Sequence, residues 1–178
     1  MTLVNQISWE AIAAIASAII ALCALGLSIW QGYLSRGHNR ISVRPHLTMW
    51  THKYHGDGLY AADIVNNGIG PAIIKCFSVK LDGKKIEGKE TEPMVKLLQA
   101  LLKGFDYDSR QSFFSPGYVM AANEKRQLVE IRFRGEKKPS PAFIEELFKK
   151  TDIYIEYESM YGEKFQLSTE KLRAERKQ

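Results

Sequence analysis

The strongest pattern in the sequence is an uninterrupted apolar run near its start, over residues 11–30. The run contains no charged residue, and about 20 apolar residues in a helix are enough to cross the hydrocarbon core of a bilayer. Trp9 precedes the run, and Trp30 and Tyr33 lie at its other end, at the depths that aromatic rings favour in membranes. A buried helix of a soluble protein is the alternative, but such helices rarely lack a polar face over this length. The pattern therefore predicts a single transmembrane helix.

Small and polar residues recur within this helix at spacings of three and four, which places them on one face. Bulky residues such as Ile15 and Ile19 fall on another face. Because lipid tails are as apolar as leucine, small residues favour close packing between helices over contact with lipid. The alternative is that small residues are common in membrane helices, where Ser17 and Ser28 can bond their own backbone. We interpret the small face as a surface for self-association, made of Glu10, Ala14, Ser17, Ala21, Ala24, Ser28 and Gln31.

Basic residues flank the predicted span on one side only. Residues 1–10 contain no Lys or Arg, whereas Arg36, Arg40 and Arg44 follow the apolar run. Since segments rich in Lys and Arg stay in the cytoplasm, we expect the N-terminus outside and the rest of the chain in the cytoplasm. The three arginines are expected to set this topology and to contact anionic headgroups, with about 1 kcal/mol each near the surface. The absence of Lys and Arg before a run of this length predicts an uncleaved anchor.

Beyond residue 45 the pattern changes to short alternating strands separated by turn residues. The clearest strand is residues 126–134, in which Val129, Ile131 and Phe133 alternate with charged positions and are expected to face a core. In residues 72–82, one face is expected to carry Ile73, Phe77, Val79 and Leu81. Further strands are expected at residues 47–55, 59–66, 85–87, 113–121, 153–159 and 164–169.

Two amphipathic helices are expected between these strands. The first begins after Thr91 with Pro93 in its first turn and ends before Gly104. The second has Ser140 as its N-cap and Pro141 at the first helical position. The apolar positions of the first helix are Met94, Leu97, Leu98, Leu101 and Leu102.

Residues 105–111 show neither the two-residue repeat of a strand nor the repeat of a helix, and they are predicted to form a loop. About seven short strands at regular spacing predict a mainly β fold, an antiparallel sandwich or barrel decorated by two helices.

Two segments carry a resemblance to a known family. VNNGIGPAIIKCFSVKLDG (residues 65–83) resembles the strand–turn–strand signature of immunoglobulin-like, CARDB-like domains in bacterial proteins, and YVMAANEKRQLVEIRF (118–133) resembles their following edge. An N-terminal anchor followed by Arg-Pro and such a domain is similar to bacterial single-pass membrane proteins. The resemblance implies an immunoglobulin-like β-sandwich at a bacterial inner membrane and says little about activity. The expected organisation is an anchor helix (1–36), a linker (37–45), a β-sandwich (46–169) and a charged tail (170–178).

Residues with catalytic or metal-binding chemistry are few. A metal site would use His46, His52, His55 and Asp57, but on a strand His52 and His55 point to opposite faces. A surface hairpin with incidental histidines is the simpler interpretation. Asp106 and Asp108 flank a loop tyrosine with nothing nearby to complete a site, and Glu156 and Glu158 suit cross-strand salt links. Residues 66–71 lack the Lys-Ser/Thr and the helix of a phosphate-binding loop.

The net charge and the two cysteines limit the kinds of partner and cofactor that the chain is expected to bind. A net charge of +5 without a dense basic cluster indicates attraction to anionic headgroups, and no nucleic acid is expected as a partner. Cys23 and Cys76 lie in a membrane helix and a strand, so no disulfide is expected, and no metal or cofactor is predicted.

Three functions remain open. The leading interpretation is a membrane-anchored, non-enzymatic module that binds an unidentified cytosolic protein or senses a signal. The alternative is a membrane-perturbing effector of a defence or toxin system, in which assembled anchors open a leak. The third is a metal-dependent enzyme that uses the histidine hairpin.

Overall fold

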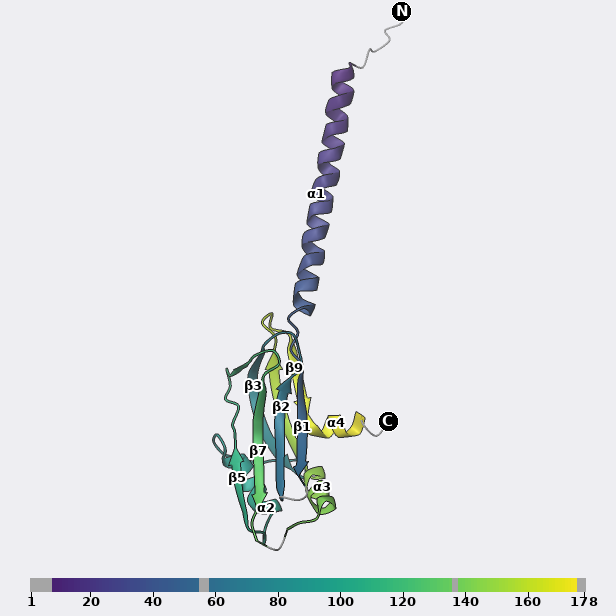
Figure 1. The fold of residues 1–178 in the computed structure, drawn as a ribbon. Coiled ribbons are helices and arrows are strands. Elements are labelled where there is room, and N and C mark those ends of the chain that lie inside the picture. Colours follow the sequence, from purple (N-terminus) through teal and green to yellow (C-terminus); the bar gives the residue numbers. More distant parts are fainter. Residues whose placement is uncertain (1–7, 55–57, 136–137, 176–178) are drawn as a thin grey trace, which may run out of the picture. The chain divides into compact units, whose positions relative to one another are not determined.

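The chain divides between Ser42 and Val43 into two compact units, an N-terminal helix and a mainly β domain (Figure 1). A computed structural model of the protein describes residues 8–54, 58–135 and 138–175. We call residues 43–178 the β domain.

The N-terminal unit is the helix α1, Trp9–Ile41, and none of its 33 residues is buried. At 1.5 Å per residue its length is about 50 Å. The helix is long and apolar enough to cross a membrane. It begins at Ser8, whose Oγ accepts a hydrogen bond from the Ala11 N–H at 3.3 Å.

The prediction that this helix ends near residue 36 is wrong. Gly37 lies inside α1, and residues 37–41 of the predicted linker are helical. A glycine inside a helix costs only about 1 kcal/mol relative to alanine, so it does not by itself end the helix. The end comes at Ser42, whose N–H and hydroxyl both donate to the His38 carbonyl oxygen.

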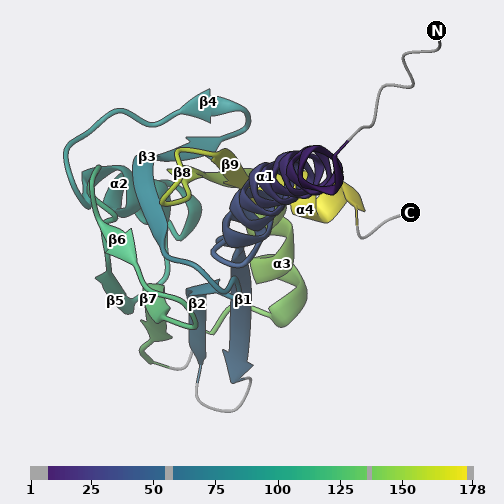
Figure 2. The ribbon, with the colours of Figure 1, turned by 90° about the horizontal axis from the view of Figure 1, so that it is seen from above.

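The strands of the β domain form two antiparallel sheets. The first sheet has the order β1 (Leu47–Tyr54), β2 (Leu59–Asn66), β7 (Lys125–Phe133) and β5 (Tyr107–Gln111). The second has the order β4 (Lys84–Lys85), β3 (Ala72–Leu81), β8 (Thr151–Glu158) and β9 (Lys164–Ser168), and β6 (Val119–Met120) also pairs with β3. Figure 2 shows the two sheets as separate layers.

The strand order is that of an immunoglobulin-type sandwich. Lettering β1, β2, β3, β5, β7, β8 and β9 from A to G gives A-B-E-D for the first sheet and C-F-G within the second. The predicted mainly β sandwich is therefore confirmed.

Three short helices accompany the sheets in the described part of the domain, where two were predicted. α2 (Glu92–Leu101) buries Met94, Leu97 and Leu98, as its apolar spacing predicts. α3 (Pro141–Lys149) begins as expected, with Ser140 Oγ accepting the Phe143 N–H at 3.2 Å. The additional helix, α4 (Thr169–Glu175), lies mostly in the predicted charged tail.

The core lies between the sheets in two adjoining clusters. The first joins residues such as Ile64 and Leu128 of the first sheet to Ile74 and Ile155 of the second, and all four are completely buried. The second surrounds Phe133 and includes side chains of α2 and α3. The sandwich is thus closed partly by sheet-on-sheet packing and partly by helices.

Two irregularities decide which side chains enter this core. Val129, Ile131 and Phe133 face inward as predicted, but Leu128 is buried as well, because β7 shifts register against β2 at this point. In β3 a register shift between Ile74 and Cys76 buries Ile74 completely. The prediction that Ile73 belongs to the inward face is therefore wrong, since the bulge reverses the alternation.

Residues 105–111 were predicted to form a loop, yet residues 107–111 are β5. The strand pairs with β7 from Tyr107↔Phe133 to Gln111↔Val129. Its short polar sequence carries no strand signal of its own. Its extended conformation comes from the hydrogen-bonded ladder to β7.

Candidate functional site

The residues of the predicted self-association face lie in α1, where they are exposed like the rest of the helix. At 100° per residue, its members from Glu10 to Gln31 fall within an arc of about 100°. Ser28 Oγ donates to the Ala24 carbonyl oxygen at 2.9 Å, so this hydroxyl bonds its own helix backbone. Arg36 and Arg40 lie in the last part of α1. Arg44 belongs to the β domain, where its guanidinium lies 4.9 Å from the centre of the Phe165 ring.

The Asn-x-Gly-x-Gly-Pro segment, residues 66–71, holds neighbouring parts of the backbone together. Asn66 is completely buried between the segment that precedes β1 and the loop that follows β6. Its Oδ1 accepts hydrogen bonds from the N–H groups of His46 and Gly68, both at 3.1 Å. Its Nδ2 donates to the carbonyl oxygens of Gly70 (2.9 Å), Met120 (3.2 Å) and Ala121 (3.0 Å).

Both glycines of the segment are required by close backbone contact. A Cβ on Gly70 would lie 1.7 Å from the Val43 carbonyl oxygen, and one on Gly68 would lie 2.3 Å from the His46 nitrogen. The segment that resembles a family signature therefore has a role in folding, which is to hold the residues before β1 against the turn after β2.

One of the three histidines considered for a metal site, His52, lies against a carboxylate. His52 Nε2 lies 2.7 Å from Asp63 Oδ2, and Lys125 Nζ lies 2.8 Å from the same oxygen. Asp63 is buried on the outer side of the first sheet, and the basic side chains of His52 and Lys125 lie against its carboxylate. Within residues 8–54, 58–135 and 138–175, no three His, Cys, Asp or Glu side chains gather in a metal-binding group. His55 and Asp57 lie outside the described residues.

The remaining acidic candidates take part in surface ion pairs and hydrogen bonds. Asp108 pairs with Arg134, and the predicted cross-strand link is confirmed for Glu158, whose Oε1 lies 2.6 Å from Lys75 Nζ. Glu156 accepts instead from the Tyr154 hydroxyl on its own strand, at 2.8 Å.

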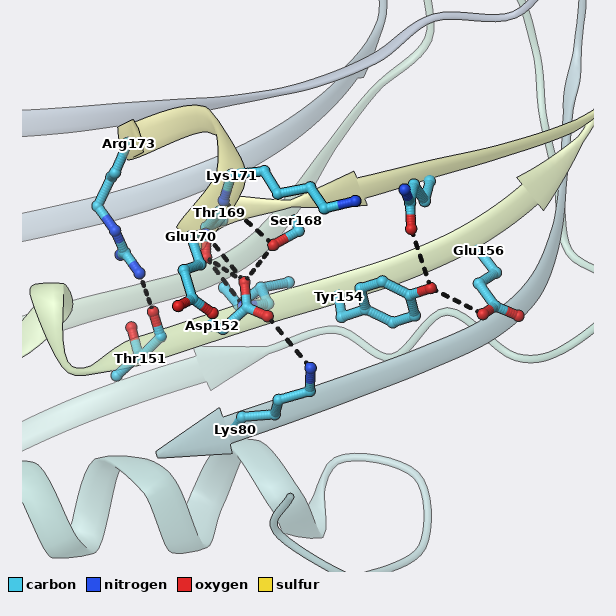
Figure 3. A network of polar contacts seen from close by, with 12 residues as sticks. Lys80, Thr151, Asp152, Tyr154, Glu156, Ser168, Thr169, Glu170, Lys171 and Arg173 are labelled. Atoms are coloured by element: carbon cyan, nitrogen blue, oxygen red, sulfur yellow. Dashed lines mark hydrogen bonds and ion pairs between the residues drawn. The ribbon is translucent and has the colours of Figure 1, made fainter. Parts of the chain in front are cut away.

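A buried carboxylate that the sequence did not single out organises the C-terminal part of the domain (Figure 3). Asp152 Oδ1 accepts hydrogen bonds from the Ser168 hydroxyl at 2.9 Å, the Thr169 hydroxyl at 3.1 Å and the Glu170 N–H at 3.0 Å. Lys80 Nζ lies 3.5 Å from its other oxygen. Burial alone would raise the pKa of Asp152, but these hydrogen bonds and Lys80 outweigh burial and lower it. The carboxylate thus caps the first turn of α4.

A second contact fixes α4 beside α3. Arg173 donates from Nη1 to the Phe148 carbonyl oxygen at 2.7 Å, and from Nη2 to the Thr151 carbonyl oxygen. Phe148 belongs to α3 and Thr151 to β8, so one guanidinium joins three elements. The two helices thus form a border next to the start of β8.

This border is one wall of a cleft of about 610 Å³, and β1 is the other wall. The volume lies within the range of about 300 to 1,000 Å³ that is usual for ligand clefts. The interior is lined mainly by apolar side chains from both sheets, α3 and α4: Met49, Ala62, Val129, Ile131, Ile144, Phe148, Ile153 and Leu172. The sequence analysis missed this cleft because its residues come from separate elements. The one available signal was the expected immunoglobulin-like strand order, in which the first strand lies at the edge of a sheet.

No protein-family model matches the sequence, and no curated protein matches it. The relation to bacterial single-pass proteins with CARDB-like domains therefore stays a prediction.

Proposed function

We propose that the chain is a non-enzymatic interaction module, held at a bacterial inner membrane by α1 with its β domain in the cytoplasm. The observation that carries this proposal is the exposure of α1. Ile20 and Leu22 are each 69% exposed and Leu25 is 58% exposed. Apolar surface in water costs about 25 cal/mol per Å², so a lipid environment is the favourable one for such a helix.

The polar clusters of the β domain support a binding role over a catalytic one. Asp63 is paired with His52 and Lys125, and Asp152 caps a helix, so each of these buried carboxylates has a structural use. A further feature is the apolar cleft beside β1, which suits binding more than proton transfer.

A reporter fusion tests the membrane proposal. An enzyme that is active only in the periplasm, fused after Gln178, is expected to be silent, because Arg36 and Arg40 retain their side of α1 in the cytoplasm. Replacing both arginines by glutamine should increase the periplasmic signal, while Lys164→Gln, which removes a basic residue far along the chain from α1, should leave it unchanged. Strong periplasmic activity of the unaltered chain would contradict the orientation, and extraction of the chain by carbonate would contradict the anchor.

The division of α1 into two faces favours a second candidate, a membrane-perturbing effector. Helices that associate through the small face in a larger ring would place Glu10 and Gln31 at the two mouths of a narrow path. Overexpression should then collapse the membrane potential, as read with a potential-sensitive dye. Ala21→Ile should abolish the collapse, whereas Ile19→Leu on the bulky face should preserve it. An unchanged potential at matched expression would eliminate this candidate.

A further inference from the structure

The strand β1 has one unused hydrogen-bonding edge. Among residues 8–54, 58–135 and 138–175, it pairs with β2 alone, in a register from Leu47↔Asn66 to Tyr54↔Leu59. Asn67 donates to the His46 carbonyl oxygen at 2.8 Å, and hydrogen-bonded pairs recur at every second residue of an antiparallel ladder. The backbone groups of Met49 and Thr51 therefore point away from β2.

The start of this edge is covered by another side chain. The Leu47 N–H donates to the Tyr157 hydroxyl at 3.2 Å, which closes the edge at that residue. Further along, Met49 and Thr51 line the cleft. Natural sheets usually protect an open edge with charges, prolines or covering elements, and β1 carries a single permanent charge, that of Lys53 near its end.

The apolar cleft lies directly beside the open edge. Ile144 and Phe148 of α3, Ile153 of β8 and Leu172 of α4 form the side opposite β1. The Asp152 and Arg173 contacts tie α4 to β8 and α3 on this side of the cleft.

The chemistry of the edge identifies the kind of occupant. An extended polypeptide presents donors and acceptors at the repeat of a strand, which matches Met49 and Thr51. Its side chains alternate between the two faces of the sheet, so every second side chain would point into the apolar cleft. A small molecule or a lipid tail would fill the cleft without satisfying the backbone of β1.

We propose that an extended segment of a partner protein adds to the free edge of β1 as a further strand of the first sheet, with alternate apolar side chains in the cleft. The inference rests on the proposed function, because it names the surface and the class of partner of that interaction module. The segment carries apolar residues at every second position and no charge among them.

Peptide selection on the full-length chain in lipid nanodiscs tests the inference. Random dodecapeptides displayed on phage are selected against the wild-type chain and, in parallel, against Thr51→Arg. Thr51 is exposed and lines the cleft, so arginine there blocks the site without emptying the core. Gln127→Arg is the matched control, because it adds the same charge to the exposed outer face of β7, away from the cleft. Peptides with alternating apolar residues should be enriched on the wild type and on Gln127→Arg but lost on Thr51→Arg.

Backbone pairing is then measured with the best synthetic peptide. Hydrogen exchange followed by mass spectrometry should show slower exchange across residues 47–54 when the peptide is bound. N-methylation of the two peptide amides that face β1 should weaken binding by about tenfold or more, since each backbone hydrogen bond contributes about 0.5 to 1.5 kcal/mol. Methylation of the two amides that face away should leave the affinity unchanged.

Three results of the peptide experiments would overturn the inference. They are the absence of any enriched peptide, equal enrichment on Thr51→Arg, and equal loss of affinity from both methylation patterns. Protection of residues 47–54 that grows with chain density in the absence of peptide would assign the edge to a second copy and also reject the partner segment. The reporter fusion and the carbonate extraction test the membrane proposal independently of peptide binding. If no peptide binds at β1, the membrane proposal is therefore unaffected.

Discussion

The Asn66 side chain donates to the Gly70 carbonyl oxygen at 2.9 Å and, through its other end, accepts the His46 N–H at 3.1 Å. One buried amide thus ties the turn after β2 to the segment that leads into β1. Gly70 also lies against the Val43 backbone. The contacts of Asn66 and Gly70 therefore fix the position of the first residues of the β domain.

Replacing Asn66 should be among the most destabilising changes in the domain. Asn66→Ala leaves buried backbone donors and acceptors without partners, at about 1 to 3 kcal/mol for each unsatisfied group. We expect a total loss of about 3 to 5 kcal/mol in the free energy of unfolding, measured by urea denaturation of the full chain in detergent. The control is Asn67→Ala, because Asn67 is exposed and its side chain donates to the Thr48 hydroxyl at 2.7 Å. Similar losses from both variants would contradict the role of Asn66.

Asp152 predicts a specific dependence of stability on pH. Its pKa is lowered in the folded domain, so the folded state favours the ionised form. This contribution is present above the unfolded pKa of about 3.9 and is lost as the pH falls through the folded pKa. The free energy of unfolding should therefore decrease on acidification below about pH 4 in the wild type, and decrease less in Asp152→Asn.

The control for this experiment is Asp106→Asn, since Asp106 is exposed. Its pH profile should follow that of the wild type. An Asp152→Asn profile parallel to the wild type down to pH 2 would show that the hydrogen bonds to α4 do not depend on charge.

The elements predicted best are those whose signals are local. β2 occupies residues 59–66 as expected, and the N-cap Ser140 and the strand with Val129 and Phe133 follow from spacing alone. β5 could not be predicted because its order comes from pairing with β7, a partner many residues away. The burial of Ile74 in place of Ile73 depends on a bulge, which has no signature in the alternation itself.

The candidate sites, too, could be predicted only where their residues belong to one segment of the chain. The face of α1 is a periodic property of one helix, so it is visible in the sequence. Asp152 and Arg173 are charged residues in a strand and a helix, and their use becomes clear only when β8, β9 and α4 meet. The cleft beside β1 depends on the packing of both sheets with two helices, and no single segment encodes it.

Phe133 tests the second core cluster. Its ring packs edge-on against Tyr60, with ring centres 5.7 Å apart, and it is 3% exposed. Phe133→Ala should reduce the free energy of unfolding by about 3 to 5 kcal/mol, the usual cost of emptying an aromatic core site. Arg132→Ala, on the exposed side of the same strand, should change it by less than about 0.5 kcal/mol. A loss below that limit for Phe133→Ala would place its ring outside the core.

The final prediction is that α1 self-associates through its small face. Helices in lipid gain little from burying leucine or isoleucine, so close backbone approach between small residues supplies most of the attraction. Ala21→Ile and Ser17→Leu should therefore reduce association in a two-helix membrane assay, because each adds bulk where the backbones meet. Ile15→Leu and Ile19→Leu keep volume on the other face and should leave association unchanged. Equal effects from both faces, or none from either, would make α1 a tether alone, and the effector candidate would then lose its assembly step.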